Sequence, residues 1–134
     1  MKKGIIFLIL ILTLLICGIT LYSKRENSKL YGISIKYDEV ITFSFNKRGE
    51  VKHAVKEDGG VLSDNYVDMA LGDAVNKYLS ETLLEVNEDK NTIMLISHYD
   101  KTLLKTNYVD IVANAMRSYI DEKEFSVILV INEK

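Results

Sequence analysis

Few side chains in this sequence could carry acid–base chemistry. His53 and His98 are the two histidines. His53 alternates with the apolar Val51 and Val55, as a packed or edge-facing residue of a strand does. His98 ends an apolar run just before a possible helix start, a place where ligand sites of α/β proteins often lie. Because no nucleophile stands at a recognisable spacing from His98, the sequence favours structural roles for both histidines.

Two pairs of adjacent acids, Asp38-Glu39 and Glu57-Asp58, could act as paired carboxylates. Adjacent acids at strand breaks are more typical of solvated turns. The sequence contains no Gly-rich phosphate loop, no G-x-S-x-G elbow and no HExxH motif. We therefore expect no catalytic residues, no cofactor and no metal site. Five tyrosines are interpreted as core edges rather than as a platform for sugars: Tyr66, Tyr78, Tyr99, Tyr108 and Tyr119.

An uncharged, almost wholly apolar run occupies residues 4–22 and has basic residues on both sides. A helix over this run would be roughly 27 Å long at about 1.5 Å per residue, close to the thickness of a bilayer's hydrocarbon core. The sequence thus predicts a transmembrane anchor. Residues 1–3 would be a cytoplasmic start, 23–29 a juxtamembrane linker and 30–134 one domain.

A cleaved signal peptide and a lipoprotein are the alternatives to an anchor. No A-x-A-like cleavage site follows the run, and Ile16 stands before Cys17 where a lipoprotein would need a small residue. An uncleaved signal anchor is favoured. A short cytoplasmic start is the usual form of such an anchor, so the domain is expected outside the cytoplasm, although Lys and Arg flank the run on both sides.

Charge and cysteine content limit what the domain can be. Two of the 17 Lys and Arg residues precede the apolar run, which leaves fifteen against nineteen Asp and Glu, a net charge of about −4. This balance argues against nucleic acid as a partner. Cys17 is the single cysteine and lies within the apolar run. The domain can therefore form neither a disulfide nor a thiolate metal site, and its stability must come from packing.

Residues 33–55 alternate apolar and polar side chains in three short runs, as strands with one buried face do. The breaks between the runs are Asp38-Glu39 and the turn Asn46-Lys47-Arg48-Gly49. The sequence therefore predicts an antiparallel meander of three strands. The expected inward-facing residues are Ile33, Ile35 and Tyr37, then Ile41, Phe43 and Phe45, then Val51, His53 and Val55.

Beyond the meander the apolar spacing becomes helical. One stripe runs from Val67 to Leu79, with Asp64 or Asp73 as its cap. A second covers residues 104–120, with Asp100 or Thr102 as its cap. The apolar runs 93–96 and 127–131 predict two further strands, the first of them covered on both faces or central in the sheet.

These elements give an expected fold class of an N-terminal transmembrane helix plus a small α+β domain. The expected element order is β-β-β-α-β-α-β. Each strand-helix-strand segment favours a right-handed crossover between parallel strands, so we expect a mixed sheet with the helices packed on it. Two layers around one core are feasible for about a hundred residues.

The stretch from Ile33 through the Asn46–Gly49 turn to Glu57-Asp58-Gly59 resembles the opening of the extracytoplasmic middle domain of RsgI-like anti-sigma factors. In that family a strand, an Asn-Pro pair, a second strand, an Asn-Arg-x-Gly-like turn, a third strand and an Asn-Glu-Asp-Gly-like loop follow one another. Leu71-Gly72-Asp73-Ala74 is similar to the start of the family's first helix, and residues 91–97 to its Asn-Thr-Val-Leu-Ile-Ser strand. The resemblance covers nearly the whole domain.

The chain departs from the family pattern at the position of self-cleavage. Family members cleave their own chain at the Asn-Pro bond, and the ungapped register places Asp38-Glu39 there instead. The resemblance therefore implies no self-cleavage. It also implies that the family's cytosolic sigma-binding segment is absent, since only three residues precede the apolar run in this sequence.

The leading hypothesis is a single-pass membrane protein with a non-enzymatic, extracytoplasmic domain that serves as a signalling or protein-interaction accessory. Its expected partners are the membrane and a protein. One alternative is a self-processing domain that cleaves near Asp38-Glu39. Another is a cell-envelope polysaccharide-binding module that uses exposed tyrosines.

Overall fold

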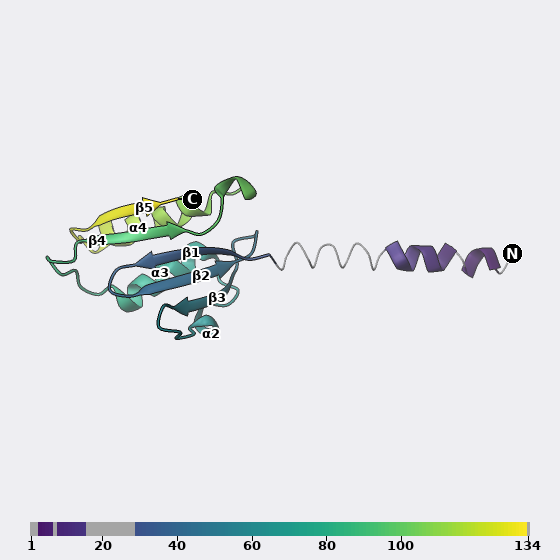
Figure 1. The fold of residues 1–134 in the computed structure, drawn as a ribbon, viewed down its shortest axis with the longest axis horizontal. Coiled ribbons are helices and arrows are strands. Elements are labelled where there is room, and N and C mark those ends of the chain that lie inside the picture. The colour runs from purple at the N-terminus through teal and green to yellow at the C-terminus, as the bar shows by residue number, and fades with distance from the viewer. Residues whose placement is uncertain (1–2, 7, 16–28, 134) are drawn as a thin grey trace.

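The computed structural model describes residues 3–6, 8–15 and 29–133. Residues 31–132 form a five-stranded sheet with α3 and α4 against one face (Figure 1). The elements are β1 (Tyr31–Lys36), β2 (Val40–Phe45), β3 (Val51–Lys56), α2 (Ser63–Tyr66), α3 (Leu71–Thr82), β4 (Thr92–Ser97), the 3₁₀-helix η1 (Lys101–Leu103), α4 (Tyr108–Glu122) and β5 (Ile128–Asn132). The α+β class and the mixed sheet agree with the sequence prediction.

The strands lie in the order β3-β2-β1-β4-β5. The first three form the antiparallel meander expected from their alternation. β4 pairs with β1 in the antiparallel sense, and β5 pairs with β4 in the parallel sense. The segment β4-α4-β5 therefore joins neighbouring parallel strands, as the crossover rule predicts.

The predicted element order and the first crossover need correction. The short helices α2 and η1 were not expected. The segment from β3 to β4 does not join parallel neighbours, because β4 lies beyond β1 and runs opposite to β3. The outer side of β3 is occupied by two isolated bridges, Val55 to Val61 and Glu50 to Ala70. β4 therefore pairs at the free edge of β1.

The inward-facing prediction for β3 was confirmed for Val51 and wrong for His53 and Val55, which are exposed. The register between β2 and β3 shifts at Ser44 and Phe45, so that Phe45 pairs with Val51 and Phe43 with Ala54. The extra residue turns the following side chains to the opposite face, as a β-bulge does. Val51 and Ala54 are buried, and His53 is exposed.

Both long helices bury most of the stripe that their spacing predicted, with Val67 and Ile111 as exposed exceptions, and they begin at other residues than expected. α3 starts at Leu71 after Ala70, which makes no side-chain cap, and Asp64 lies in α2 instead. α4 is capped by Asn107, whose Oδ1 accepts the Asp110 backbone N–H at 3.1 Å. The expected caps were wrong because η1, capped by Asp100, comes between β4 and α4.

The predicted transmembrane anchor over residues 4–22 also needs correction. In the described part of the chain, no helix has both the length and the apolar character needed to cross a bilayer. Residues 3–6 and 8–15 are helical. Residues 16–28, which include Cys17 and most of the expected linker, lie outside the described residues.

The turn between β2 and β3 is hydrogen-bonded to Tyr108, the first residue of α4. The buried Asn46 side chain accepts backbone N–H groups of Arg48 and Glu50 at 3.0 and 3.1 Å. Tyr108 donates its hydroxyl to the Lys47 carbonyl at 2.8 Å. Gly49 has φ +78°, and a Cβ there would clash with the Tyr108 ring. Position 49 therefore requires glycine for two reasons: the positive φ disfavours other residues, and the Tyr108 ring leaves no space for a Cβ.

We expect Gly49→Ala to lower the free energy of unfolding by about 3 kcal/mol, because it adds a steric clash to an unfavourable φ. Gly59→Ala is the matched control, since Gly59 has φ +91° and open space where the Cβ would stand. It should cost only about 1 kcal/mol. Urea denaturation followed by circular dichroism measures both. Equal losses for the two variants would contradict the role assigned to Tyr108.

Candidate functional site

The two histidines lie on the face of the sheet that the helices leave open. His53 pairs with Ser44, Ser44 pairs with Gly32, and the His98 backbone N–H donates to the Gly32 carbonyl. Three strand spacings of about 4.8 Å separate the histidines, roughly 14 Å. They cannot share a metal ion or a proton. The described residues also contain no group of three or more His, Cys, Asp or Glu side chains that could hold a metal.

A serine–histidine contact was missed by the sequence analysis. Ser34 Oγ lies 2.6 Å from His98 Nε2 and 2.6 Å from Thr42 Oγ1. Ser34 and His98 are 64 residues apart and meet because β4 pairs with β1. The available signal was the small polar residue Ser34 between Ile33 and Ile35 of β1. A serine–histidine pair is the core of nucleophilic catalysis, yet Ser34 is only 2% exposed and so cannot reach a substrate. We assign this cluster a structural role.

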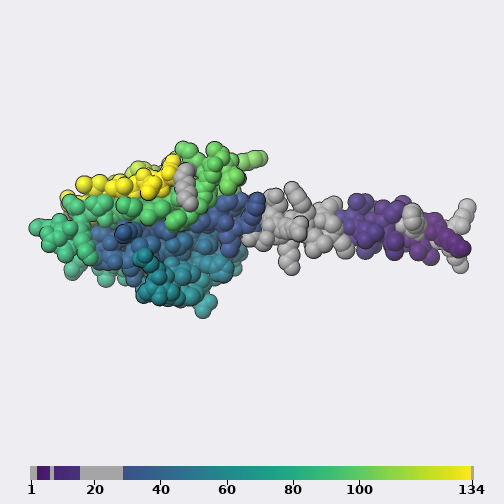
Figure 2. All heavy atoms as spheres, viewed as in Figure 1, coloured from purple at the N-terminus to yellow at the C-terminus, as the bar shows by residue number. Residues whose placement is uncertain are grey.

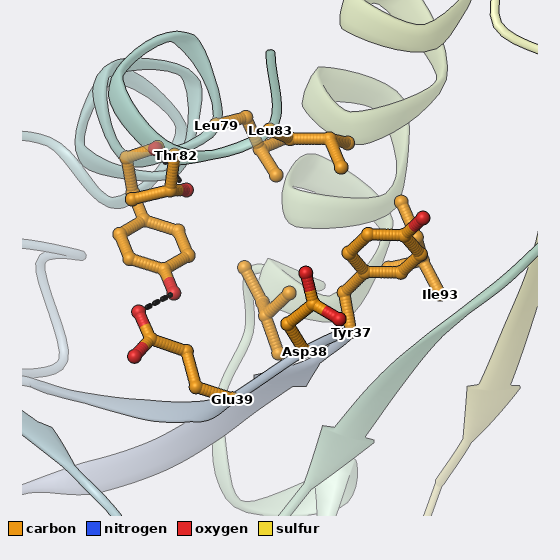
Figure 3. A pocket seen from close by; sticks show the side chains of 9 residues that line it. Tyr37, Asp38, Glu39, Leu79, Thr82, Leu83 and Ile93 are labelled. Carbon is orange, nitrogen blue, oxygen red and sulfur yellow. Dashed lines mark hydrogen bonds between the residues drawn. The ribbon is translucent and has the colours of Figure 1, made fainter. Parts of the chain in front are cut away.

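The predicted carboxylate pair Asp38-Glu39 lies in the turn between β1 and β2, beside a pocket of about 240 Å³ (Figure 3). The pocket opens between this turn, the last turns of α3 and the start of β4. Its described lining residues are Ile35, Tyr37, Asp38, Glu39, Tyr78, Leu79, Thr82, Leu83 and Ile93. Apolar side chains form its inner wall, and the two carboxylates stand at its rim. This pocket is the candidate functional site.

The two carboxylates have different partners and do not form a catalytic pair. Glu39 Oε1 accepts a hydrogen bond from the Tyr78 hydroxyl at 3.0 Å, drawn as a dashed line in Figure 3. Glu39 Oε2 lies 3.4 Å from Lys56 Nζ. Asp38 Oδ1 lies 2.7 Å from Lys90 Nζ. The other acid pair, Glu57-Asp58, is exposed in a turn in which Asp58 accepts the Gly60 N–H at 2.8 Å.

Tyr37 positions the loop that supplies Lys90. Its hydroxyl donates to the Lys90 carbonyl at 2.7 Å and accepts the Asn87 N–H at 3.2 Å. The loop 87–90 closes on itself through a bridge between Asn87 and Lys90. Tyr37 therefore holds the backbone of this loop beside the pocket and brings the Lys90 ammonium to Asp38.

The hydroxyls of Tyr78, which lines the pocket, and of Tyr66 have raised pKa values and remain protonated at neutral pH. Burial raises the pKa of the Tyr78 hydroxyl, and the hydrogen bond and the negative charge of Glu39 raise it further. Burial also raises the pKa of Tyr66 to about 12, with an additional contribution from Glu81. General acid–base catalysis requires a pKa near the working pH. These raised pKa values do not suit proton transfer at neutral pH; the Tyr78 and Tyr66 hydroxyls instead donate hydrogen bonds to Glu39 and Glu81.

The five tyrosines weighed as a sugar platform are all buried. Their exposed fractions do not exceed 7%. Tyr66 and Tyr78 pack edge-on against Phe43, while Tyr99 and Tyr108 pack edge-on against Phe45. Stacking on a sugar requires an accessible ring face, which these residues do not offer. Burial supports the core-edge interpretation.

Comparison of the chain with protein-family models, with curated proteins and with solved structures gives no match. Functional inference therefore depends on the residues and the geometry described above.

We expect the protein to lose stability as the pH rises above 10, because folding raises the pKa of Tyr66, Tyr78 and Tyr99. A group whose pKa is raised from 10.0 to about 12, as for Tyr66, stabilises the fold fully below pH 10. This contribution disappears as the pH approaches 12. Tyr66→Phe should therefore flatten the decline in unfolding free energy between pH 10 and 12. Urea titrations at each pH measure it.

Glu81→Gln serves as the companion variant, since it keeps the Tyr66 hydroxyl but removes the carboxylate that lies 3.3 Å away. It should shift the ionisation of Tyr66, followed by tyrosinate absorbance, to lower pH. An unchanged alkaline decline in both variants would refute the assignment.

Proposed function

We propose that this chain provides a non-enzymatic protein-interaction domain, a signalling accessory similar to the extracytoplasmic middle domain of RsgI-like anti-sigma factors. The observation that carries the proposal is the uncovered face of the sheet. α3 and α4 both lie behind the sheet in Figure 1, and in Figure 2 the strands form the face that the viewer sees. A broad sheet face without a helix over it is available to another protein.

Apolar side chains gather at the β4–β5 end of this face. Register places Met94 beside Val130, and Ile128 and Ile96 flank this pair along their strands. Ile128 is 59% exposed and Val130 39%. We call Met94, Ile96, Ile128 and Val130 the β4–β5 patch. An exposed cluster of large apolar residues is typical of protein-binding surfaces.

The edge of the sheet next to this patch offers a second means of recognition. Within the described chain, β5 pairs on one side only, with β4. Its residues Ile128–Asn132 include neither proline nor charge, the features that usually block an edge strand. An extended segment of a partner could add to β5 through main-chain hydrogen bonds while its side chains contact the β4–β5 patch.

The resemblance to RsgI-like domains supports a signalling role for this interaction. The turn Asn46-Lys47-Arg48-Gly49 joins β2 to β3, the position at which the family's comparable turn occurs. Asp38-Glu39 lies between β1 and β2, where the family has its cleavage site. In this chain Asp38 pairs with Lys90, and Glu39 contacts Tyr78 and Lys56, so the turn is held by ion pairs and a hydrogen bond.

Site-specific photo-crosslinking in the native host tests the proposal. A photoreactive amino acid at Val130 should give a discrete adduct with one partner protein, because this side chain lies on the open face. The matched position is Ser118, which is exposed on α4 on the opposite side. It should give no such adduct.

A second variant tests the chemistry of the contact. With the probe at Ile128, the additional change Val130→Asp should reduce adduct yield at least about fivefold, because a charge in an apolar interface must be desolvated. Adducts of equal yield from Ser118 and Val130, or none from either position, would count against a partner on this face.

A further inference from the structure

We infer that the pocket beside Asp38 binds an alkylammonium group, meaning a primary ammonium on a short hydrocarbon stem. This site goes beyond the proposed interaction surface. The pocket opens between the sheet and the end of α3, whereas the β4–β5 patch lies on the opposite face of the sheet. Either site can exist without the other.

The inner wall of the pocket suits a hydrocarbon stem. Ile35, Leu79, Leu83 and Ile93 belong to the core, and none is more than 3% exposed. Their packing fixes the wall before any ligand arrives. The pocket volume of about 240 Å³ exceeds that of a cavity of about 150 Å³, which accepts benzene. A chain of four or five carbon atoms therefore fits by volume.

The charge at the rim selects a cation. Among the described lining residues, Asp38 and Glu39 are negative and none is positive. Figure 3 shows the Asp38 carboxylate pointing toward the middle of the pocket, below Leu83. α3 ends beside the pocket with no basic residue in its last turn, so the negative end of its dipole adds to the same field. Both carboxylates already pair with lysines from outside the lining, Glu39 with Lys56 and Asp38 with Lys90, so a ligand ammonium must compete with one of these ion pairs.

The Lys90 side chain occupies the place beside Asp38 that the ligand ammonium would take. Its ammonium, on a four-carbon stem, is the same chemical group as the inferred ligand and lies 2.7 Å from Asp38 Oδ1. The Lys90 and Asp38 side chains are 57% and 65% exposed. Exposed ion pairs of this kind are weak. An incoming ammonium can therefore displace Lys90 while its stem gains contact with the apolar wall.

This competition gives two variants with opposite expected effects. Asp38→Asn removes the carboxylate and should weaken binding at least about fivefold. Lys90→Gln frees the carboxylate and should tighten binding about threefold. Asp121→Asn, an exposed change of equal charge on α4, should leave the affinity unchanged. A structural role for Asp38 and Lys90 alone would not produce opposite shifts.

The experiment is an NMR titration of the ¹⁵N-labelled full-length chain with n-butylammonium chloride at constant ionic strength. We expect saturable shifts at the backbone amides of Asp38, Leu83 and Ile93, with a dissociation constant of about millimolar for so small a ligand. n-Butanol and butyrate are the matched probes that keep the stem and change the charge. They should bind at least about tenfold more weakly.

A second arm identifies the natural source of the group. Nα-acetyl-lysine methylamide presents the same stem and ammonium on a peptide unit. Binding at least as tight as that of n-butylammonium assigns the pocket to a lysine of a partner protein, and binding only of n-butylammonium assigns it to a free amine. Unsaturable shifts, equal binding of n-butanol, or affinity that does not change in both Asp38→Asn and Lys90→Gln would overturn the inference. Crosslinking from Val130 in the Asp38→Asn variant reports separately on the interaction surface.

Discussion

The organisation of this domain depends on one constraint, that two helices must cover a five-stranded sheet and both lie on the same face. The apolar side chains of β1, β2 and β4 that face α3 and α4 are fully buried. The opposite face keeps its exposed and polar residues because no described helix packs on it. The core between the sheet and the two helices stabilises the domain, and the opposite face of the sheet remains accessible to a partner.

The pocket follows from the same arrangement. α3 ends at Thr82, and the chain then leaves the sheet before it returns as β4 at Thr92. The space beyond the last turn of the helix is closed on one side by core residues and on the other by the turn between β1 and β2. An apolar wall therefore meets a charged turn at this end of the domain. The chemistry of the pocket results from where a helix ends, not from a recognisable motif.

Local patterns predicted those parts of the fold that local physics controls. Alternation with period two located β1 and β2 because each has one buried face, and helical spacing located the buried stripes of α3 and α4. The same reasoning failed at β3, where the pairing with β2 inserts one extra residue and reverses the faces of His53 and Ala54. It failed again at the helix starts, because η1 uses the cap that was expected for α4.

The transmembrane prediction shows a different limit. The apolar composition of residues 4–22 indicates only that the segment would move from water into a membrane. A membrane span also requires a helix of sufficient length. The described residues contain no helix that meets both requirements.

By itself the sequence determined the α+β class, the alternating buried residues of β1 and β2, most of the stripes of both long helices and the position of the Asn46–Gly49 turn. These features depend on neighbours within a few residues, whose side chains set the local conformation. Tertiary structure alone decided that β4 lies beside β1, that Ser34 meets His98, and that Asp38 stands over a pocket lined by α3. Each of these depends on contacts between residues far apart in the chain. Such contacts depend on which sheet edges and faces other elements already occupy. The bridges on the outer side of β3, for example, occupy that edge, and β4 pairs with β1 instead.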